Sequence, residues 1–117
     1  MKTDIKNSYF AGLIDGEGNV AIYKYKSGRI RPVIRVHMTC KDTVMALYIY
    51  FGGYFGEKKI EDLPNRKKQW TWEVTHKSAK EVAELIYPYV ITKSKNVKAI
   101  IDYIPNTRGR KKAPLLK

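Results

Sequence analysis

One nine-residue stretch near the start of the chain decides its fold: Phe10-Ala11-Gly12-Leu13-Ile14-Asp15-Gly16-Glu17-Gly18. As a helix, this stretch has two faces with different roles. Phe10 and Ile14 share one face and are expected to anchor the helix in the core of its own chain. The neighbouring face has glycines four positions apart and consists of Tyr9, Gly12, Leu13 and Gly16.

The two glycines indicate close contact with a second helix. Each interior Gly destabilises a helix by roughly 0.5–1 kcal/mol relative to Ala, so a pair of them suggests a specific use. Without side chains, the backbone can approach a neighbouring helix closely. At the end of the helix, Asp15 and Glu17 place two carboxylates where the helix dipole is already negative. A bound cation would compensate this charge.

The stretch closely resembles the signature of the LAGLIDADG homing endonucleases, with Phe10, Gly16 and Glu17 where the signature has Leu, Ala and Asp. In that family two such helices pack side by side, and the last acidic residue of each binds a divalent metal at the DNA backbone. The resemblance implies that Glu17 and the main-chain carbonyl of Gly16 bind Mg²⁺, which Mn²⁺ could replace. The alternative is an ordinary amphipathic helix that ends in a Gly-rich turn.

A single motif supplies only half of such a site. We therefore expect a homodimer in which the helices of two copies pack across a two-fold axis and bring both Glu17 carboxylates together. The predicted interface consists of Tyr9, Gly12, Leu13 and Gly16. Asp15 is expected to be structural and to hold the helix end or its partner.

Length and composition predict one domain. A chain of 117 residues can bury one core, and we divide it into a domain at 1–105 and a basic tail at 106–117. There is no apolar run of the roughly 20 residues that span a membrane, and no signal peptide is apparent. The single Cys40 cannot form an intramolecular disulfide. We expect an intracellular, reducing location, in a prokaryotic cytoplasm or an organelle, wherever the target genome lies.

The charge balance indicates a polyanionic partner. Twenty-three Lys and Arg residues against eleven Asp and Glu give a net charge of +12. The excess is concentrated, since residues 18–41 carry six basic and no acidic side chains and residues 103–117 carry five and none. Such blocks are typical of nucleic-acid binding. From charge alone, the basic surface of a thermostable or ribosome-associated protein is an alternative.

Hydrophobic periodicity predicts the order α-β-β-α-β-β-α-α. Helices are expected at 5–16, capped by Thr3 or Asp4, at 41–50, from a Ser78 cap to Pro88, and at 94–104. Strands are expected from Asn19, at 30–39, at 54–60 and at 67–75, with a turn at Ser27-Gly28 and a loop at 61–65. The family resemblance implies an α+β fold: a four-stranded antiparallel sheet with helices on one face and nucleic acid on the other.

The same patterns predict which apolar residues are buried. The inward residues of the later helices are expected to be Val44, Leu47, Tyr48, Val82, Leu85, Ile86, Val97, Ile100 and Ile101. Trp70 and Trp72 are two positions apart on the last strand, as core residues would be. A platform for stacking nucleic-acid bases is the alternative.

A basic residue is expected near the scissile phosphate. The segment 88–95 resembles the stretch that precedes the last core helix in the family, where a pocket lysine is found. Lys93 occupies that position, with Lys95 as a rival. Cys40 falls where relatives often place a water-positioning residue such as Gln, for which a thiol is a poor substitute. Either Thr39 or His37 takes this role, or the role is not required here. Cys40 itself would then be an ordinary small buried hydrophobe.

Base and phosphate contacts are expected from the outward faces of the strands. An antiparallel ribbon fits the major groove, where Arg pairs with guanine and Asn or Gln with adenine. The predicted DNA-binding residues are Asn19, Tyr23, Tyr25, Ser27, Arg29, Arg31, Arg35, His37, Thr39, Lys58, Lys67, Gln69 and Thr71. The tail is either a phosphate contact or a disordered end, with basic residues at Arg108, Arg110, Lys111 and Lys112.

The resemblance therefore implies a homodimeric, Mg²⁺-dependent homing endonuclease with Glu17 and Lys93 as catalytic residues. Its partner would be double-stranded DNA with a long, nearly palindromic site, cut to leave short 3′ overhangs. The intron RNA that encodes the chain is a further partner that the resemblance allows. Two alternatives are an RNA-binding intron maturase that does not cut and a non-catalytic DNA-binding regulator. Neither has a chemical need for an acid at position 17.

Overall fold

The computed structural model describes residues 2–58 and 67–105, and side chains from residue 5 onward. The elements alternate as the sequence predicts, which confirms the α+β class. They are α1 (Lys2–Glu17), β1 (Gly18–Lys24), β2 (Ile30–Met38), α2 (Lys41–Phe51), β3 (Tyr54–Lys58), β4 (Gln69–Thr75), α3 (His76–Ile86), the short 3₁₀ helix η1 (Tyr87–Tyr89) and α4 (Ser94–Asp102). The end of the predicted third strand, the loop at 61–65 and the basic tail lie outside the described residues.

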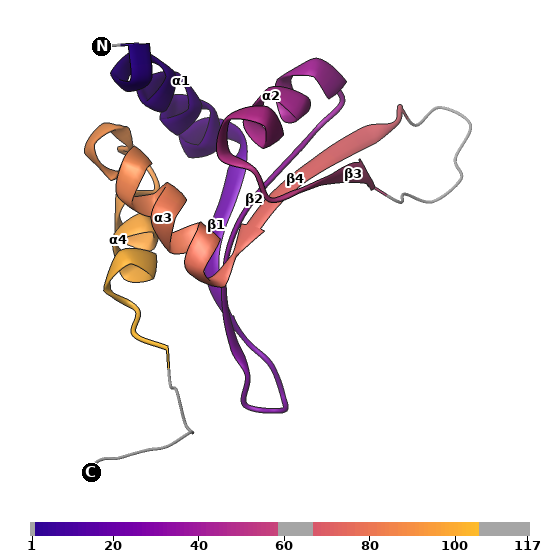
Figure 1. The fold of residues 1–117 in the computed structure, drawn as a ribbon. Coiled ribbons are helices and arrows are strands. Elements are labelled where there is room, and N and C mark those ends of the chain that lie inside the picture. The colour runs from indigo at the N-terminus through magenta and orange to yellow at the C-terminus, as the bar shows by residue number, and fades with distance from the viewer. Residues whose placement is uncertain (1, 59–66, 106–117) are drawn as a thin grey trace.

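The four strands form one antiparallel sheet in the order β1-β2-β4-β3. Two hairpins thus lie side by side, with β2 against β4 at the centre. Helices cover one side of the sheet, while the hairpins diverge on the other side (Figure 1). Cross-strand partners share a face of a sheet, so the pairings define the open face, on the side away from the helices. It consists of Asn19, Ala21, Tyr23, Arg31, Val33, Arg35, His37, Tyr54, Gly56, Lys58, Gln69, Thr71, Glu73 and Thr75.

The core lies between the other face of the sheet and the helices. Phe10 and Ile14 of α1 are buried there, as predicted. Trp72 is fully buried, and its indole N–H donates to the carbonyl oxygen of Gly52 at 2.8 Å. Trp70 is partly buried, and its ring stacks on Phe55 at a centroid distance of 5.8 Å. The tryptophans therefore belong to the core, and the stacking-platform alternative is wrong.

Several predicted helix ends are wrong by a few residues. Thr3 and Asp4 lie inside α1, which begins at Lys2. Helix α3 begins at His76, because β4 continues directly into it with Thr75 as the N-cap. Ser78 therefore lies within its first turn. Helix α4 ends at Asp102 instead of at residue 104, in keeping with the poor fit of helical geometry before a proline.

Two side chains predicted to be buried are exposed. Tyr48 is 43% exposed, because α2 carries more apolar residues than one helix face can bury. Leu85 is 44% exposed, because the buried face of α3 consists of Ala79, Val82, Ala83 and Ile86. None of the helices in the described parts of the chain is long and apolar enough to cross a membrane.

Candidate functional site

The end of α1 brings the predicted catalytic residues to one place. Glu17 is the last residue of the helix and is exposed, and Gly18 starts β1. A Cβ atom at Gly18 would lie 2.7 Å from the carbonyl oxygen of Ile14, so this sharp change from helix to strand has no room for a side chain. The glycine thus fixes the position of Glu17 at the point where the helix meets the sheet.

Asp15 ties this helix end to the segment between α3 and α4. Its carboxylate accepts hydrogen bonds from the backbone N–H groups of Ile91, Thr92 and Lys93 at 2.9, 3.0 and 2.7 Å. Burial raises the pKa of Asp15, but these donors and the charge of Lys93 outweigh it, and the net pKa lies below the ordinary 3.8. The contacts of Asp15 are those of the structural residue that the sequence predicts.

The side chain of Lys93 also contacts the end of α1. Its ammonium donates to the main-chain carbonyl oxygen of Asp15 at 2.6 Å. The Lys93 side chain therefore lies at the same end of α1 as Glu17. Lys95 is exposed on α4 and makes no such contact in the described residues, so the geometry favours Lys93 over its rival.

The predicted dimer face of α1 is uncovered. Tyr9 is 58% exposed, and Cβ atoms built at Gly12 and Gly16 meet no atom within 4 Å. Leu13 is partly buried. Ile5, one turn before Tyr9, is 69% exposed and extends this surface. We call this set the glycine face; it consists of Ile5, Tyr9, Gly12, Leu13 and Gly16.

A family model now identifies the chain. The model described as LAGLIDADG endonuclease matches residues 10–104. The chain belongs to the LAGLIDADG endonuclease family. No sequence among the curated proteins compared matches it significantly.

Solved structures of LAGLIDADG endonucleases share this fold. The homing endonuclease I-CvuI in complex with its target has a TM-score of 0.69 and 19% identity, covering 86% of this chain and 66% of that chain. The archaeal intron-encoded homing endonuclease I-Vdi141I has a TM-score of 0.64 and 19% identity, covering 83% and 65%. For I-GzeII the values are 0.59 and 21%, covering 81% and 35%. This chain thus spans less than two thirds of the length of each.

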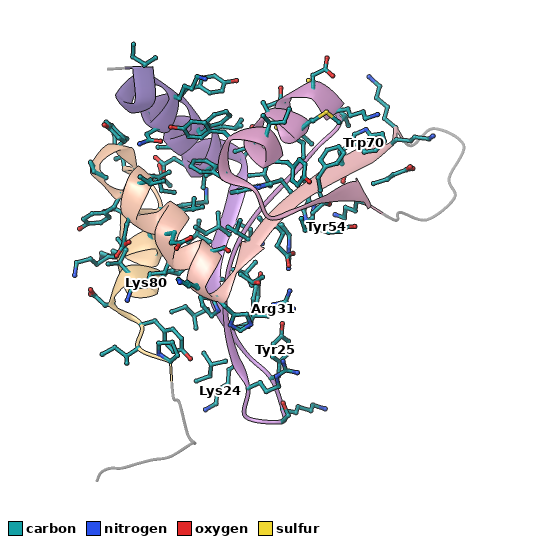
Figure 2. The ribbon with its side chains drawn as sticks, viewed as in Figure 1. Lys24, Tyr25, Arg31, Tyr54, Trp70 and Lys80 are labelled. Atoms are coloured by element: carbon teal, nitrogen blue, oxygen red, sulfur yellow. The ribbon has the colours of Figure 1, made fainter. Side chains whose placement is uncertain are left out.

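The open face of this LAGLIDADG chain holds eight of the predicted DNA-binding residues: Asn19, Tyr23, Arg31, Arg35, His37, Lys58, Gln69 and Thr71. Arg31 and Tyr25 lie on the open side of the first hairpin, and Tyr54 lies on the same side of the second (Figure 2). The remaining predicted residues border the strands: Tyr25, Ser27 and Arg29 in the first turn, Thr39 after β2 and Lys67 before β4.

Two residues of the open face that make specific side-chain contacts, Glu73 and Tyr54, are not among the predicted DNA-binding residues. Glu73 accepts hydrogen bonds from Arg31 and Arg35, both at 2.7 Å. Tyr54 is 58% exposed, and its side chain lies over Gly56, where a Cβ atom would collide with its hydroxyl. The alternation of β4 was a signal for the outward position of Glu73. The register between β2 and β4 cannot be read from the sequence. The pairing of Glu73 with Arg31 and Arg35 therefore could not be predicted.

His37 and Cys40, two residues considered for water positioning, have different surroundings. The ring Nδ1 of His37 lies 2.7 Å from the hydroxyl of Thr71. Burial lowers the pKa of His37 below 6.5, the charges of Lys58 and Arg35 lower it further, and Glu73 opposes them. The neutral form of the ring is therefore favoured at pH 7. The Cys40 thiol is exposed, so its interpretation as a buried hydrophobe is wrong.

A hollow of about 710 Å³ lies between the first hairpin turn and helices α3 and α4. Its lining includes Arg29, Lys77 and Lys80 but neither Glu17 nor Lys93. Among the described residues, no three His, Cys, Asp or Glu side chains gather where they could hold a metal ion. The exposed carboxylate of Glu17 at the end of α1 remains the predicted metal ligand.

Proposed function

We propose that this chain is a homodimeric, divalent-metal-dependent endonuclease that cuts both strands of DNA at a long, nearly palindromic site. The observation that carries the proposal is the end of α1. There the exposed carboxylate of Glu17 ends a helix whose glycine face is uncovered, and the ammonium of Lys93, from the segment before α4, contacts the same helix end. Phosphodiester hydrolysis needs a carboxylate to hold a metal and a cation to compensate charge on the phosphate.

The open face supports double-stranded DNA as the substrate. It combines basic side chains with amide and hydroxyl groups, which are the groups that contact phosphates and base edges. The net charge of +12 favours association with a polyanion. I-CvuI, I-Vdi141I and I-GzeII, which share the fold, were each solved in complex with DNA.

A second copy of the chain would complete the site. Helix α1 ends in one candidate metal-binding carboxylate, and two copies of the chain would supply one for each DNA strand. Packing the glycine faces of two copies against each other would cover Tyr9 and bring both Glu17 residues to the two-fold axis. The open space around Gly12 and Gly16 is compatible with the close approach of a second backbone.

The oxygen ligands at the end of α1 suit Mg²⁺, and Mn²⁺ would be a substitute. The Glu17 carboxylate and the Gly16 carbonyl are hard oxygen ligands, which Mg²⁺ prefers, and both residues are exposed. When bound, the metal would compensate charge on the scissile phosphate and activate water. Glu17 would hold it, and the Gly18 turn would fix Glu17.

Lys93 would act on the phosphate from the adjacent segment. Its ammonium has three N–H donors, of which one contacts the carbonyl oxygen of Asp15. The others can reach a phosphate oxygen or orient the attacking water. Asp15 would act through Lys93, because it fixes the backbone that carries this lysine.

The finer properties of the reaction rest on family resemblance. They are short 3′ overhangs, a role in intron homing and intron RNA as a second partner. Such an enzyme would act inside the cell, wherever its target genome lies.

The proposal is tested by cleavage of a plasmid pool that carries randomised sites. The wild type should make double-strand cuts with Mg²⁺ at one recovered, nearly palindromic site. Glu17→Gln removes the charge of a metal ligand with little change in volume, so cleavage should fall by more than about 100-fold while binding persists. Glu84→Gln, the same change at an exposed site on α3, should cut normally.

Undiminished cutting by Glu17→Gln would refute the catalytic assignment. Tight binding of DNA by the wild type without cutting, in any of Mg²⁺, Mn²⁺ and Ca²⁺, would favour the maturase or regulator instead. Structured RNA would then be the next ligand to test.

A further inference from the structure

One acidic residue lies at the centre of the open face. The carboxylate of Glu73 forms ion pairs with two of the predicted DNA-binding arginines, at 2.7 Å from the Arg31 guanidinium and 2.7 Å from that of Arg35. The Glu73 side chain is 16% exposed, against 37% and 26% for the two arginines. This arrangement, the arginine bridge, consists of Arg31, Glu73 and Arg35.

A carboxylate in this position opposes the binding of DNA. It repels phosphates and neutralises cations that would otherwise contact them. The two ion pairs, however, fix the directions of both guanidinium groups. This effect on the geometry of the arginines is what the carboxylate can contribute to recognition.

The register of the sheet explains how one carboxylate holds both arginines. Glu73 on β4 is directly opposite Arg35 on β2, and Arg31 is four positions away along β2. Val33 lies between the two arginines on the same face, and yet it is only 1% exposed. The apolar stems of Arg31 and Arg35 are long enough to cover part of Val33 when both guanidinium groups point toward Glu73. The two ion pairs to one carboxylate hold both guanidinium groups at the same place on the sheet.

Two tyrosines hold the arginines on their other sides. The Arg35 guanidinium carbon lies 5.8 Å from the centre of the Tyr23 ring. Nη1 of Arg31 donates to the hydroxyl of Tyr25 at 3.3 Å. Arg31, Tyr25 and Tyr54 all lie toward the space between the two hairpins (Figure 2).

The two arginines retain different donors. Arg35 uses Nε for Glu73, and in the described part of the chain its Nη1 and Nη2 donate to no protein atom. Both Nη atoms of Arg31 are already engaged, with Glu73 and Tyr25. A pair of terminal N–H groups in one plane matches O6 and N7 of guanine in the major groove. Arg35 is therefore the arginine that is prepared for a bidentate base contact.

We propose that Glu73 is a positioning residue for sequence recognition, which fixes Arg35 to read one guanine in each half-site and keeps both arginines away from the phosphates. The proposal rests on the proposed recognition of DNA. It adds a specificity-determining residue and the base that it selects.

The test begins with selection of preferred sites from a randomised duplex pool in Ca²⁺ by the full chain. The wild type should enrich a motif with a guanine at one position of each half-site. Glu73→Gln keeps the shape of the side chain but frees the arginines, so the preference for that guanine should fall at least about tenfold. Freed arginines should also contact phosphates, which would steepen the dependence of log Kd on log salt by about one to two.

Asp102→Asn is the matched control. It also removes one negative charge and breaks an ion pair, that of Lys98 and Asp102 on α4, away from the sheet. It should change neither the motif nor the salt slope. Arg35→Lys is a second variant that retains the charge but not the planar fork. It should lose the preference for the same guanine, and the dependence of log Kd on log salt should not change.

The outcomes separate this inference from the proposed enzyme activity. If Glu73→Gln selects the wild-type motif with the wild-type salt slope, the inference is wrong and the endonuclease proposal stands. If the wild type enriches no motif, both the inference and the site specificity of the enzyme are wrong. If the motif changes as expected but no variant cuts, the inference is supported and only the endonuclease proposal fails.

Discussion

At the level of single residues, the two carboxylates at the end of α1 have opposite surroundings. Asp15 accepts three backbone N–H groups and lies under the Lys93 ammonium. Glu17, two positions further on, is exposed and has no hydrogen-bond or ion-pair partner within the described residues. A satisfied carboxylate stabilises structure, whereas an unsatisfied one is free to bind a ligand. This contrast supports a structural role for Asp15 and a metal-binding role for Glu17.

Asp15→Asn should reduce the dependence of the free energy of unfolding on pH in the acid range. The folded-state pKa of Asp15 is depressed below its ordinary 3.8. The ionised carboxylate therefore stabilises the fold above that value, and the contribution is lost as the pH falls through the folded-state pKa. An amide oxygen is a weaker acceptor, so at pH 7 the variant should lose about 1–2 kcal/mol, a value reduced by solvent screening.

Urea denaturation of both proteins across the acid range measures this effect. The difference in midpoint between wild type and Asp15→Asn should shrink below pH 3.8. A difference that stays constant to the lowest pH would mean that the charge of Asp15 does not contribute. Asp102→Asn, which changes an exposed ion pair on α4, should show the same dependence of the urea midpoint on pH as the wild type.

Lys93→Met should impair chemistry more than binding. The substitution keeps the length of the side chain but removes the ammonium that would compensate charge on the phosphate. Single-turnover cleavage should slow by about 10²- to 10³-fold, the usual effect of losing one such group, with Kd for DNA nearly unchanged. Lys95→Met removes the same charge two residues away and should cut normally. Equal losses in the two variants would contradict the assignment of Lys93.

At the level of elements, α1 serves two surfaces at once. Phe10 and Ile14 anchor it in the core, while the glycine face remains uncovered. The helix period of 3.6 residues makes both visible in the sequence, because residues three and four apart share a face. Periodicity did not predict the exact ends of the helices, nor the exposure of Tyr48 and Leu85. These depend on which neighbouring element covers each side of a helix, and such information is not local.

Gly12→Leu should separate dimerisation from folding. A Cβ atom at Gly12 meets nothing within 4 Å in its own chain, so the fold should accept the side chain. Replacing an interior helical Gly should even stabilise the isolated chain by roughly 0.5–1 kcal/mol. Sedimentation velocity should give a monomer with native circular dichroism, and cleavage should be lost.

Ala99→Leu, a similar enlargement at an exposed position on α4, is the control and should stay dimeric. If the Gly12 variant still sediments as a dimer, the two copies do not meet through the glycine face.

At the level of the whole molecule, charge and topology act together. The net charge of +12 is that of a polyanion-binding protein, and the sheet arranges part of it on one face. Binding to non-specific duplex DNA should therefore weaken by about 10³-fold or more between roughly 50 and 200 mM salt. Fluorescence anisotropy with a labelled duplex measures this slope. A flat dependence would mean that the open face does not contact phosphates.

The part of the site that the sequence reveals is the part that depends on local order. Glu17, Asp15 and the glycines are legible because one helix contains them all. The alternation of β2 and β4 also places Arg35 and Glu73 on outward faces. That these two residues are partners depends on the register between strands more than thirty residues apart, which no local pattern encodes. The contact of Lys93 with Asp15 is likewise a tertiary contact; family resemblance indicated Lys93 as a pocket lysine but not its partner.

The strand order β1-β2-β4-β3 also has a consequence for the growing polypeptide. β1 and β2 are adjacent in the chain and can pair as soon as Met38 has emerged from the ribosome. Within the described residues, the other edge of β2 pairs with β4, and the edge strand β3 has β4 as its one neighbouring strand. Until Thr75 emerges from the ribosome, β2 therefore presents an unpaired edge, the feature through which nascent chains aggregate. Once β4 is complete, it pairs with this edge of β2 on one side and with β3 on the other.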